Sequence, residues 1–179
     1  MRFFRWLFIA IVILAAIFVG VGTLLPAKVH VEREIVINAA PDRIFPYVNN
    51  YRRFNEWSPW VERDPNAVYT FSGAEAGVGA KMSWQSDLDE VGSGSQEIVE
   101  SVENEKVVTA LDFGEMGTAD AAFVLKAEGG ATKVTWLLDS ELPSNLAARW
   151  MGLALNRLIG ADYEEGLTRL KARAEGRDP

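Results

Sequence analysis

The sequence contains no cysteine and only one histidine, and these absences exclude several kinds of chemistry. Without cysteine, the chain has no disulfide, no thiol nucleophile and no thiolate metal site. The lack of cysteine does not identify the cellular compartment, because a domain without cysteine folds in oxidising and in reducing surroundings. His30 has no neighbouring nucleophile or carboxylate pair, and no HExxH or CxxC motif accompanies it. We therefore assign no catalytic residue, no metal site and no cofactor, and we interpret His30 as an exposed residue.

Basic side chains are outnumbered, with 18 lysines and arginines against 25 acidic residues and a formal net charge of −7. Arg2 and Arg5 are the only charged residues before Lys28, so the rest of the chain has 16 basic and 25 acidic residues, a net charge of −9. An acidic domain repels phosphate backbones. This charge balance argues against a nucleic-acid partner.

Charge is missing altogether from the 20 residues between Trp6 and Leu25, which are rich in Ile, Val, Leu, Ala and Phe. A helix of about 20 such residues spans about 30 Å, the thickness of the hydrocarbon core of a bilayer. We predict a transmembrane anchor in residues 1–27 and one domain in residues 28–179. Because Arg2 and Arg5 precede the apolar run, the N-terminus is expected in the cytoplasm of a bacterium and the domain in the periplasm or outside the cell.

Two other interpretations of the apolar segment remain open. A cleaved signal peptide is one, although the apolar run exceeds the roughly 7–15 residues of a signal core and Leu25-Pro26-Ala27 makes a poor cleavage site. A buried core helix is the other, although the segment has no polar face. The retained anchor is therefore the favoured interpretation.

Residues 37–60 combine the end of a strand, two short helices and a Trp-rich loop. The strand shows the alternation of apolar and polar residues that is typical of a half-buried strand. Pro41 and Asp42 suit the first turn of a helix, and Asn49-Asn50 separates this helix from a second one. Ser58-Pro59-Trp60 ends the second helix, because the residue before a proline is disfavoured in a helix.

The residues between Trp60 and the C-terminal helix are predicted to form short strands joined by short turns. Short connections favour antiparallel pairing of neighbouring strands. A long helix follows from Ser144 to Ala174, with its start at Pro143-Ser144-Asn145 and its end at Gly176 and Pro179. Its apolar face is wide in the first half and narrower in the second. The predicted strands cover residues 29–37, 68–71, 81–87, 90–103, 107–113, 119–127 and 132–142.

The segment INAAPDRIF, the pair of short helices and the segment WSPW together resemble the START/polyketide-cyclase-like (SRPBCC) superfamily. More narrowly, they resemble bacterial SRPBCC-domain proteins that carry an N-terminal membrane anchor. The resemblance covers Val29 to Ala174. It implies an α+β helix-grip fold, in which an antiparallel sheet of about seven strands wraps around the long C-terminal helix and two short helices follow the first strand. This scaffold serves lipid carriers, hormone receptors, cyclases and co-chaperones, so the resemblance implies a fold more than a function.

Large aromatic side chains either fill a core or line a cavity for an apolar ligand, and plain core packing is the more common case. The resemblance implies a cavity between the sheet and the C-terminal helix. The internal polar residues that could act there, Gln96, Glu97, Asp112 and Thr135, have no assignable face. The candidate ligand-binding residues are Trp84, Phe113, Phe123, Trp136 and Met151 as walls, with Trp57 and Trp60 at the mouth.

The sequence is consistent with three functions. The favoured one is a membrane-anchored extracytoplasmic domain that binds a hydrophobic small molecule or lipid between the sheet and the C-terminal helix. The second is a cyclase or dehydratase-like enzyme, which needs an internal carboxylate with a shifted pKa. The third is a co-chaperone-like interaction module, which needs an exposed apolar patch on a filled core.

Overall fold

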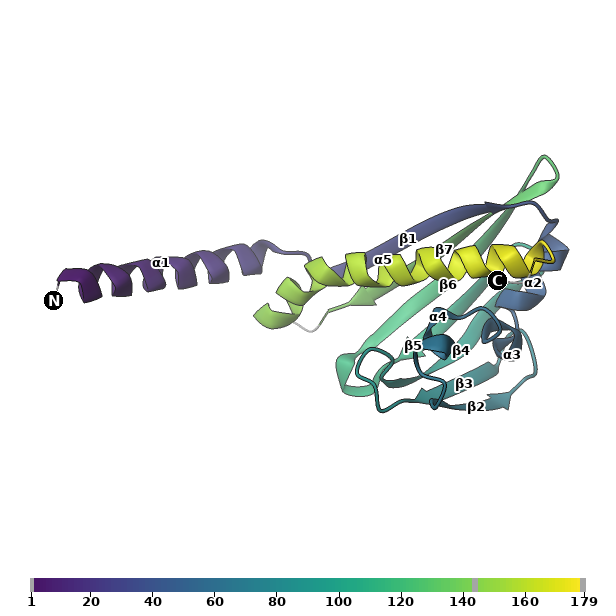
Figure 1. Ribbon diagram of the computed structural model, residues 1–179, viewed down its shortest axis with the longest axis horizontal. Coiled ribbons are helices and arrows are strands. Elements are labelled where there is room, and N and C mark those ends of the chain that lie inside the picture. Colours follow the sequence, from purple (N-terminus) through teal and green to yellow (C-terminus); the bar gives the residue numbers. More distant parts are fainter. Residues whose placement is uncertain (1, 143–144, 178–179) are drawn as a thin grey trace.

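A computed structural model describes residues 2–142 and 145–177. Figure 1 shows one long helix projecting from a domain in which a curved sheet packs against a second long helix. The helices are α1 (Arg2–Leu24), α2 (Pro41–Val48), α3 (Tyr51–Phe54), α4 (Pro59–Arg63) and α5 (Leu146–Ala174), with a 3-10 turn η1 at Gly114–Met116. The strands are β1 (Lys28–Ile37), β2 (Val68–Gly73), β3 (Ala80–Gln85), β4 (Ser93–Val102), β5 (Lys106–Asp112), β6 (Thr118–Glu128) and β7 (Ala131–Glu141).

Within the described residues the strands form one seven-stranded antiparallel sheet in the order β1-β7-β6-β5-β4-β3-β2. Strands β2 to β7 are hairpin neighbours, whereas β1 returns to pair with the last strand, β7, along its full length. The helices between β1 and β2 and the helix after β7 cover one face, here called the inner face (Figure 1). This arrangement confirms the predicted α+β helix-grip fold.

Several boundaries differ from the sequence-based prediction. Residues 86–92 leave the sheet, because the Ser86 amide donates to the Gly92 carbonyl and Gly92 adopts a positive φ of 62°. Strands β3 and β4 are therefore shorter than predicted, and the bulge in β4 lies between Ile98 and Glu100. A third short helix, α4, occupies part of the predicted Trp-rich loop.

The start of α5 is capped by Asn145, whose side-chain oxygen accepts a hydrogen bond of 2.7 Å from the Ala148 amide. An asparagine at this position satisfies one of the free amides of the first turn. The predicted start residues Pro143 and Ser144, and Pro179 at the predicted end, lie outside the described residues.

The core lies between the inner face and the second half of α5. Alternate residues of β1 are buried, and so are Tyr163, Leu167 and Leu170 on α5. Gly166 allows the helix to approach closely, because a Cβ there would lie 2.9 Å from the Trp136 ring.

We expect Gly166→Ala to lower the free energy of unfolding by about 1–2 kcal/mol. Overpacking a core costs about 1–3 kcal/mol, and the better helix propensity of alanine offsets up to about 1 kcal/mol of it. Thermal unfolding of the full-length chain in detergent measures the change. Gly152→Ala is the matched control, since its Cβ would meet the movable end of Leu142. A Gly166→Ala variant as stable as this control would contradict the tight contact.

Candidate functional site

The space between the sheet and the second half of α5 is filled by aromatic rings. The Trp136 ring of β7 stacks on Tyr163 of α5, with 3.7 Å between ring centroids, and on Phe123 of β6 at 4.8 Å. The rings of Phe54 and Trp57 meet it edge-on at 6.1 Å and 5.4 Å. Trp136 is only 3% exposed. Beneath the second half of α5, the predicted wall residues Phe123 and Trp136 are therefore packed as core.

The two predicted mouth residues adjoin this aromatic cluster. Trp57 is buried, and its Nε1 donates to the Tyr47 carbonyl over 3.1 Å. Trp60 is half-buried at the edge of the cluster, with ring centroids 5.9 Å from Trp136 and 6.5 Å from Tyr163. The structure therefore brings four of the seven predicted site residues into one cluster.

Trp84 and Phe113 form a second aromatic pair, with ring centroids 5.9 Å apart, and both are only partly buried. Trp84 lies on the inner face, because it is two residues from the buried Met82 on β3 and side chains two residues apart share a face of the sheet. Its ring lies over Gly94 of β4, where a Cβ would come within 2.7 Å, and its Nε1 donates to the Val91 carbonyl. The glycine thus fixes the position of the Trp84 ring.

A buried hydroxyl accompanies this second pair. Tyr69 lies directly opposite Trp84 in the register of β2 and β3, so it shares the inner face. Its hydroxyl oxygen is buried and has no hydrogen-bond partner among the described residues. Burial raises the pKa of the Tyr69 hydroxyl, and the Asp64 carboxylate adds to this shift. An unpaired buried polar group costs about 1–3 kcal/mol, so a bound group that pairs with it would be favoured.

The strand registers assign the four polar residues to faces. Gln96 pairs with Met82 and Leu111 and lies on the inner face. The other three are each next to an inner-face residue in their strand and therefore point outward. Glu97 makes an ion pair of 2.8 Å with Lys81. Thr135 lies opposite the exposed Glu34, and Asp112 lies opposite Ser95. Of the four, only Gln96 could orient a ligand on the inner face.

The described part of the chain has one buried carboxylate, that of Asp64 at the end of α4. Its oxygens accept hydrogen bonds from the Ser86 hydroxyl at 2.5 Å and from the Asn66 amide at 2.9 Å. The bond from Ser86 fastens the α4–β2 loop to the β3–β4 loop, and the bond from Asn66 lies within the α4–β2 loop. This role is structural and gives the hypothesis of an internal acid or base no support.

Met151 lies away from the other predicted site residues. It is 61% exposed on the first half of α5, which runs past the aromatic cluster along β1 (Figure 1). The neighbouring Gly152 is the residue that faces the domain there, against Leu142 and Val29. Its placement as a wall of the same cavity is therefore not reproduced.

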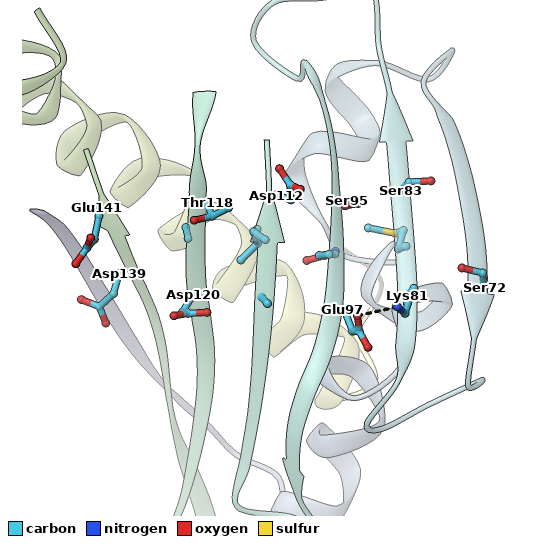
Figure 2. Close-up of a pocket in the computed structure, with 15 residues that line it drawn as sticks. Ser72, Lys81, Ser83, Ser95, Glu97, Asp112, Thr118, Asp120, Asp139 and Glu141 are labelled. Atoms are coloured by element: carbon cyan, nitrogen blue, oxygen red, sulfur yellow. Dashed lines mark ion pairs between the residues drawn. The ribbon is translucent and has the colours of Figure 1, made fainter. Parts of the chain in front are cut away.

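A hollow of about 560 Å³ lies on the outer face of the sheet, opposite α5. Figure 2 shows its polar lining and the ion pair between Lys81 and Glu97. Acidic side chains dominate it, which suits an apolar ligand poorly. The side chains that point into it include Lys81, Ser83, Ser95, Glu97, Asp112, Asp120, Asp139 and Glu141.

The single histidine also lies on the outer face. His30 Nδ1 lies 2.7 Å from Asp139 Oδ1, and Nε2 lies 3.4 Å from Glu32 Oε2. The hydrogen bond with Asp139 raises the pKa of His30 above its ordinary value of 6.5, and Glu32 adds to the effect. The side chain is 53% exposed, as interpreted from the sequence.

We expect the one histidine NMR signal of the chain to titrate above pH 6.5, and Asp139→Asn to bring the pKa back toward that value. Because the folded-state pKa is raised, the stabilisation is complete below pH 6.5 and is lost as the pH rises through the folded-state pKa. For an exposed pair the stabilisation is below about 1 kcal/mol. A histidine that titrates at or below 6.5 would contradict the contact.

Tyr163 of α5 and Tyr69 of β2 were not among the predicted site residues. Tyr163 lies in the second half of the C-terminal helix, where the apolar face is narrower, and it stacks on Trp136. Tyr69 lay in a short predicted strand, and only the pairing of β2 with β3 places it opposite Trp84. An aromatic residue in the apolar stripe facing a Trp-rich sheet is the sequence feature that could have identified Tyr163.

The model of one protein family, described as polyketide cyclase / dehydrase and lipid transport, matches residues 28–175. The chain belongs to this family. The match covers the whole sheet and α5 and excludes α1. No curated protein matches the chain with significance.

Solved structures agree with the family fold. Similar chains include the Aha1 dimer from Colwellia psychrerythraea, with 17% identity, a TM-score of 0.58, and coverage of 82% of this chain and 96% of that one. The di-domain ARO/CYC StfQ from the steffimycin biosynthetic pathway has 13% identity and a TM-score of 0.64 over 84% of this chain and 51% of that one. A protein from Thermus thermophilus has 16% identity and a TM-score of 0.60, covering 82% of this chain and 97% of that one. At these identities the similarity is one of fold.

Proposed function

We propose that this family member is a membrane-anchored domain that binds a hydrophobic small molecule or lipid on the inner face of its sheet. The observation that carries the proposal is the pair of Trp84 and Phe113, two large aromatic side chains that are in contact but only partly buried. Covering apolar surface contributes about 25 cal/mol per Å². The unpaired Tyr69 hydroxyl and the Gln96 amide supply the polar groups that would orient the ligand.

The proposed anchor is α1. Its residues Phe3–Leu24 are long and apolar enough to cross a membrane, and almost none of this helix is buried against the domain. Arg2 and Arg5 at its start favour a cytoplasmic N-terminus and a domain in the periplasm or outside the cell. An anchor of this kind would hold the inner face near a bilayer, which is a source of apolar ligands. A reporter fused after residue 179 that is active only in the cytoplasm would contradict this orientation.

Photocrosslinking of the full-length chain in vesicles that contain a photoactivatable lipid tests the site. We expect crosslinks on peptides from β3 to β5, in addition to those on α1, and their loss in Trp84→Asp. An aspartate there would place a charge where the apolar ligand lies. Val99→Asp, on an exposed β4 side chain, is the matched control and should keep the crosslinks.

The outcome separates ligand binding from anchoring. Crosslinks confined to α1 in the wild-type chain would contradict the ligand site while leaving the anchor in place. Retention of the β3–β5 crosslinks in Trp84→Asp would also contradict it. The near-ultraviolet circular dichroism of the Trp136 cluster verifies that each variant is folded.

A further inference from the structure

The first half of α5 exposes an apolar surface. Met151, Leu153 and Leu158 are 61%, 55% and 62% exposed. Met151 and Leu158 are seven residues apart, which places them on the same side of a helix, two turns apart. The exposed Ala154 and the half-buried Trp150 lie on this side too, so the apolar arc consists of Trp150, Met151, Ala154 and Leu158. Leu153 lies about 160° from Met151 around the helix and is not part of it. Single exposed apolar residues are common on protein surfaces, but neighbouring ones that form a contiguous patch usually mark a surface that contacts something else.

This apolar arc points away from the sheet. The opposite side of the helix faces the domain, with Gly152 against Leu142 and Val29. Asn156 lies on that side too, and its Nδ2 donates to the His30 carbonyl over 2.6 Å. The described residues of the domain therefore leave the arc uncovered.

The same end of α5 packs against the end of α1, as Figure 1 shows. The rings of Phe18 and Trp150 stack with centroids 4.9 Å apart, and the indole Nε1 donates to the Phe18 carbonyl. Gly22 lies against Leu146, which leaves no room for a Cβ. Phe18 lies six residues before the end of α1, or about 9 Å at 1.5 Å per residue. The start of α5 is therefore level with the last turns of α1.

Arg149 joins the two helices through the backbone. Its guanidinium donates to the carbonyl oxygens of Thr23, at 2.8 Å, and Leu25, at 3.1 Å. The last carbonyls of a helix lack partners within it, and a cation is favoured near them. This contact fixes the start of α5 beside the end of α1.

Charge distinguishes the two halves of α5. Between residues 146 and 161 the only charged residues are Arg149 and Arg157, whereas Asp162, Glu164 and Glu165 follow directly. A segment with two arginines and no acid is unusual in a part of the chain with a net charge of −9. Such a segment is attracted to anionic lipid headgroups, and arginine stems extend along apolar surface to reach them.

We propose that the first half of α5, residues 146–158, lies in the interface of the membrane that α1 crosses, with its apolar arc among the lipid chains. This rests on the proposed anchor. The stacking on Phe18 places the arc where α1 leaves the bilayer, Trp150 is of the residue type enriched there, and an apolar face beside basic residues is typical of interfacial helices. Lipid is the occupant because α1 brings the bilayer to this surface.

The absence of cysteine makes the test direct, since one introduced cysteine carries one label. The full-length variants Met151→Cys, Leu158→Cys, Thr168→Cys and Ile13→Cys each receive an environment-sensitive fluorophore in phosphatidylethanolamine–phosphatidylglycerol vesicles. Lipids with nitroxide-labelled chains are then added. We expect quenching at positions 151 and 158 comparable to that at position 13 in α1. We expect little quenching at the exposed position 168 in the second half of α5.

Each result decides a separate point. Quenching at position 13 without quenching at 151 and 158 would overturn the interfacial placement and leave the anchor intact. Absence of quenching at all four positions would overturn the anchor and this inference with it. Labels at 151 and 158 that are shielded from water but not quenched by lipid, with shielding lost on dilution in the membrane, would assign the arc to a second copy and overturn the placement in lipid.

Discussion

Replacing Trp136 by alanine is expected to lower the free energy of unfolding by about 3–5 kcal/mol. The ring lies between Tyr163 and Phe123 and is met by three further rings, so its loss leaves a cavity that rigid neighbours cannot fill. Aromatic pairs add about 0.5–1.5 kcal/mol beyond burial. A domain of this size is stable by about 5–15 kcal/mol, so the variant would lose a large share of its stability.

Chemical denaturation of the full-length chain in detergent, followed by near-ultraviolet circular dichroism, measures this loss. Trp136→Phe keeps a ring and is expected to lose less, which gives a measurable variant if alanine prevents folding. Val124→Ala, at a partly exposed position next to Phe123 on the outer face, is the control and should change stability by less than about 0.5 kcal/mol. A loss below about 1 kcal/mol for Trp136→Ala would show that the rings are not packed and would favour an open cavity there.

The fold was largely predictable because its signals are local. The alternation in β1 places Val31 and Ile37 on the buried side, and both are fully buried. The break predicted between the strands 90–103 and 107–113 is present as a turn, with Asn104 at a φ of 62°, and Gly129 and Gly130 also have positive φ in the turn between β6 and β7. Each of these features depends on a few neighbouring residues, so a single sequence contains it.

The site was less predictable because it depends on pairing between distant strands. Trp84 lies on the inner face together with Tyr69 because of the register of β2 and β3, which no local pattern fixes. The outward positions of Glu97 and Asp112 have the same origin. Met151 was predicted as a cavity wall, but it lies on the part of α5 that extends beyond the cluster towards α1, where it is exposed.

Introducing two arginines into α1, as Ile13→Arg with Ile17→Arg, is expected to abolish retention of the chain in membranes after alkaline carbonate extraction. Both side chains are exposed on the structure, so the change leaves the packing of the domain intact. A charged residue at the centre of a transmembrane helix costs about 2.5–3.5 kcal/mol on insertion scales. Two such residues would shift partitioning by about 5–7 kcal/mol, or roughly four to five powers of ten.

The control places the same two charges on the domain, as Val68→Arg with Val99→Arg at exposed strand positions, and should leave the chain in the membrane fraction. Carbonate removes helices that only lie on a membrane, so the apolar arc of α5 cannot replace α1 in this assay. A carbonate-resistant double variant would therefore contradict α1 as the anchor. An intact mass that lacks α1 in the wild-type chain would instead assign the segment to a cleaved signal peptide, and the contacts of Arg149 and Trp150 with α1 would then exist only before cleavage.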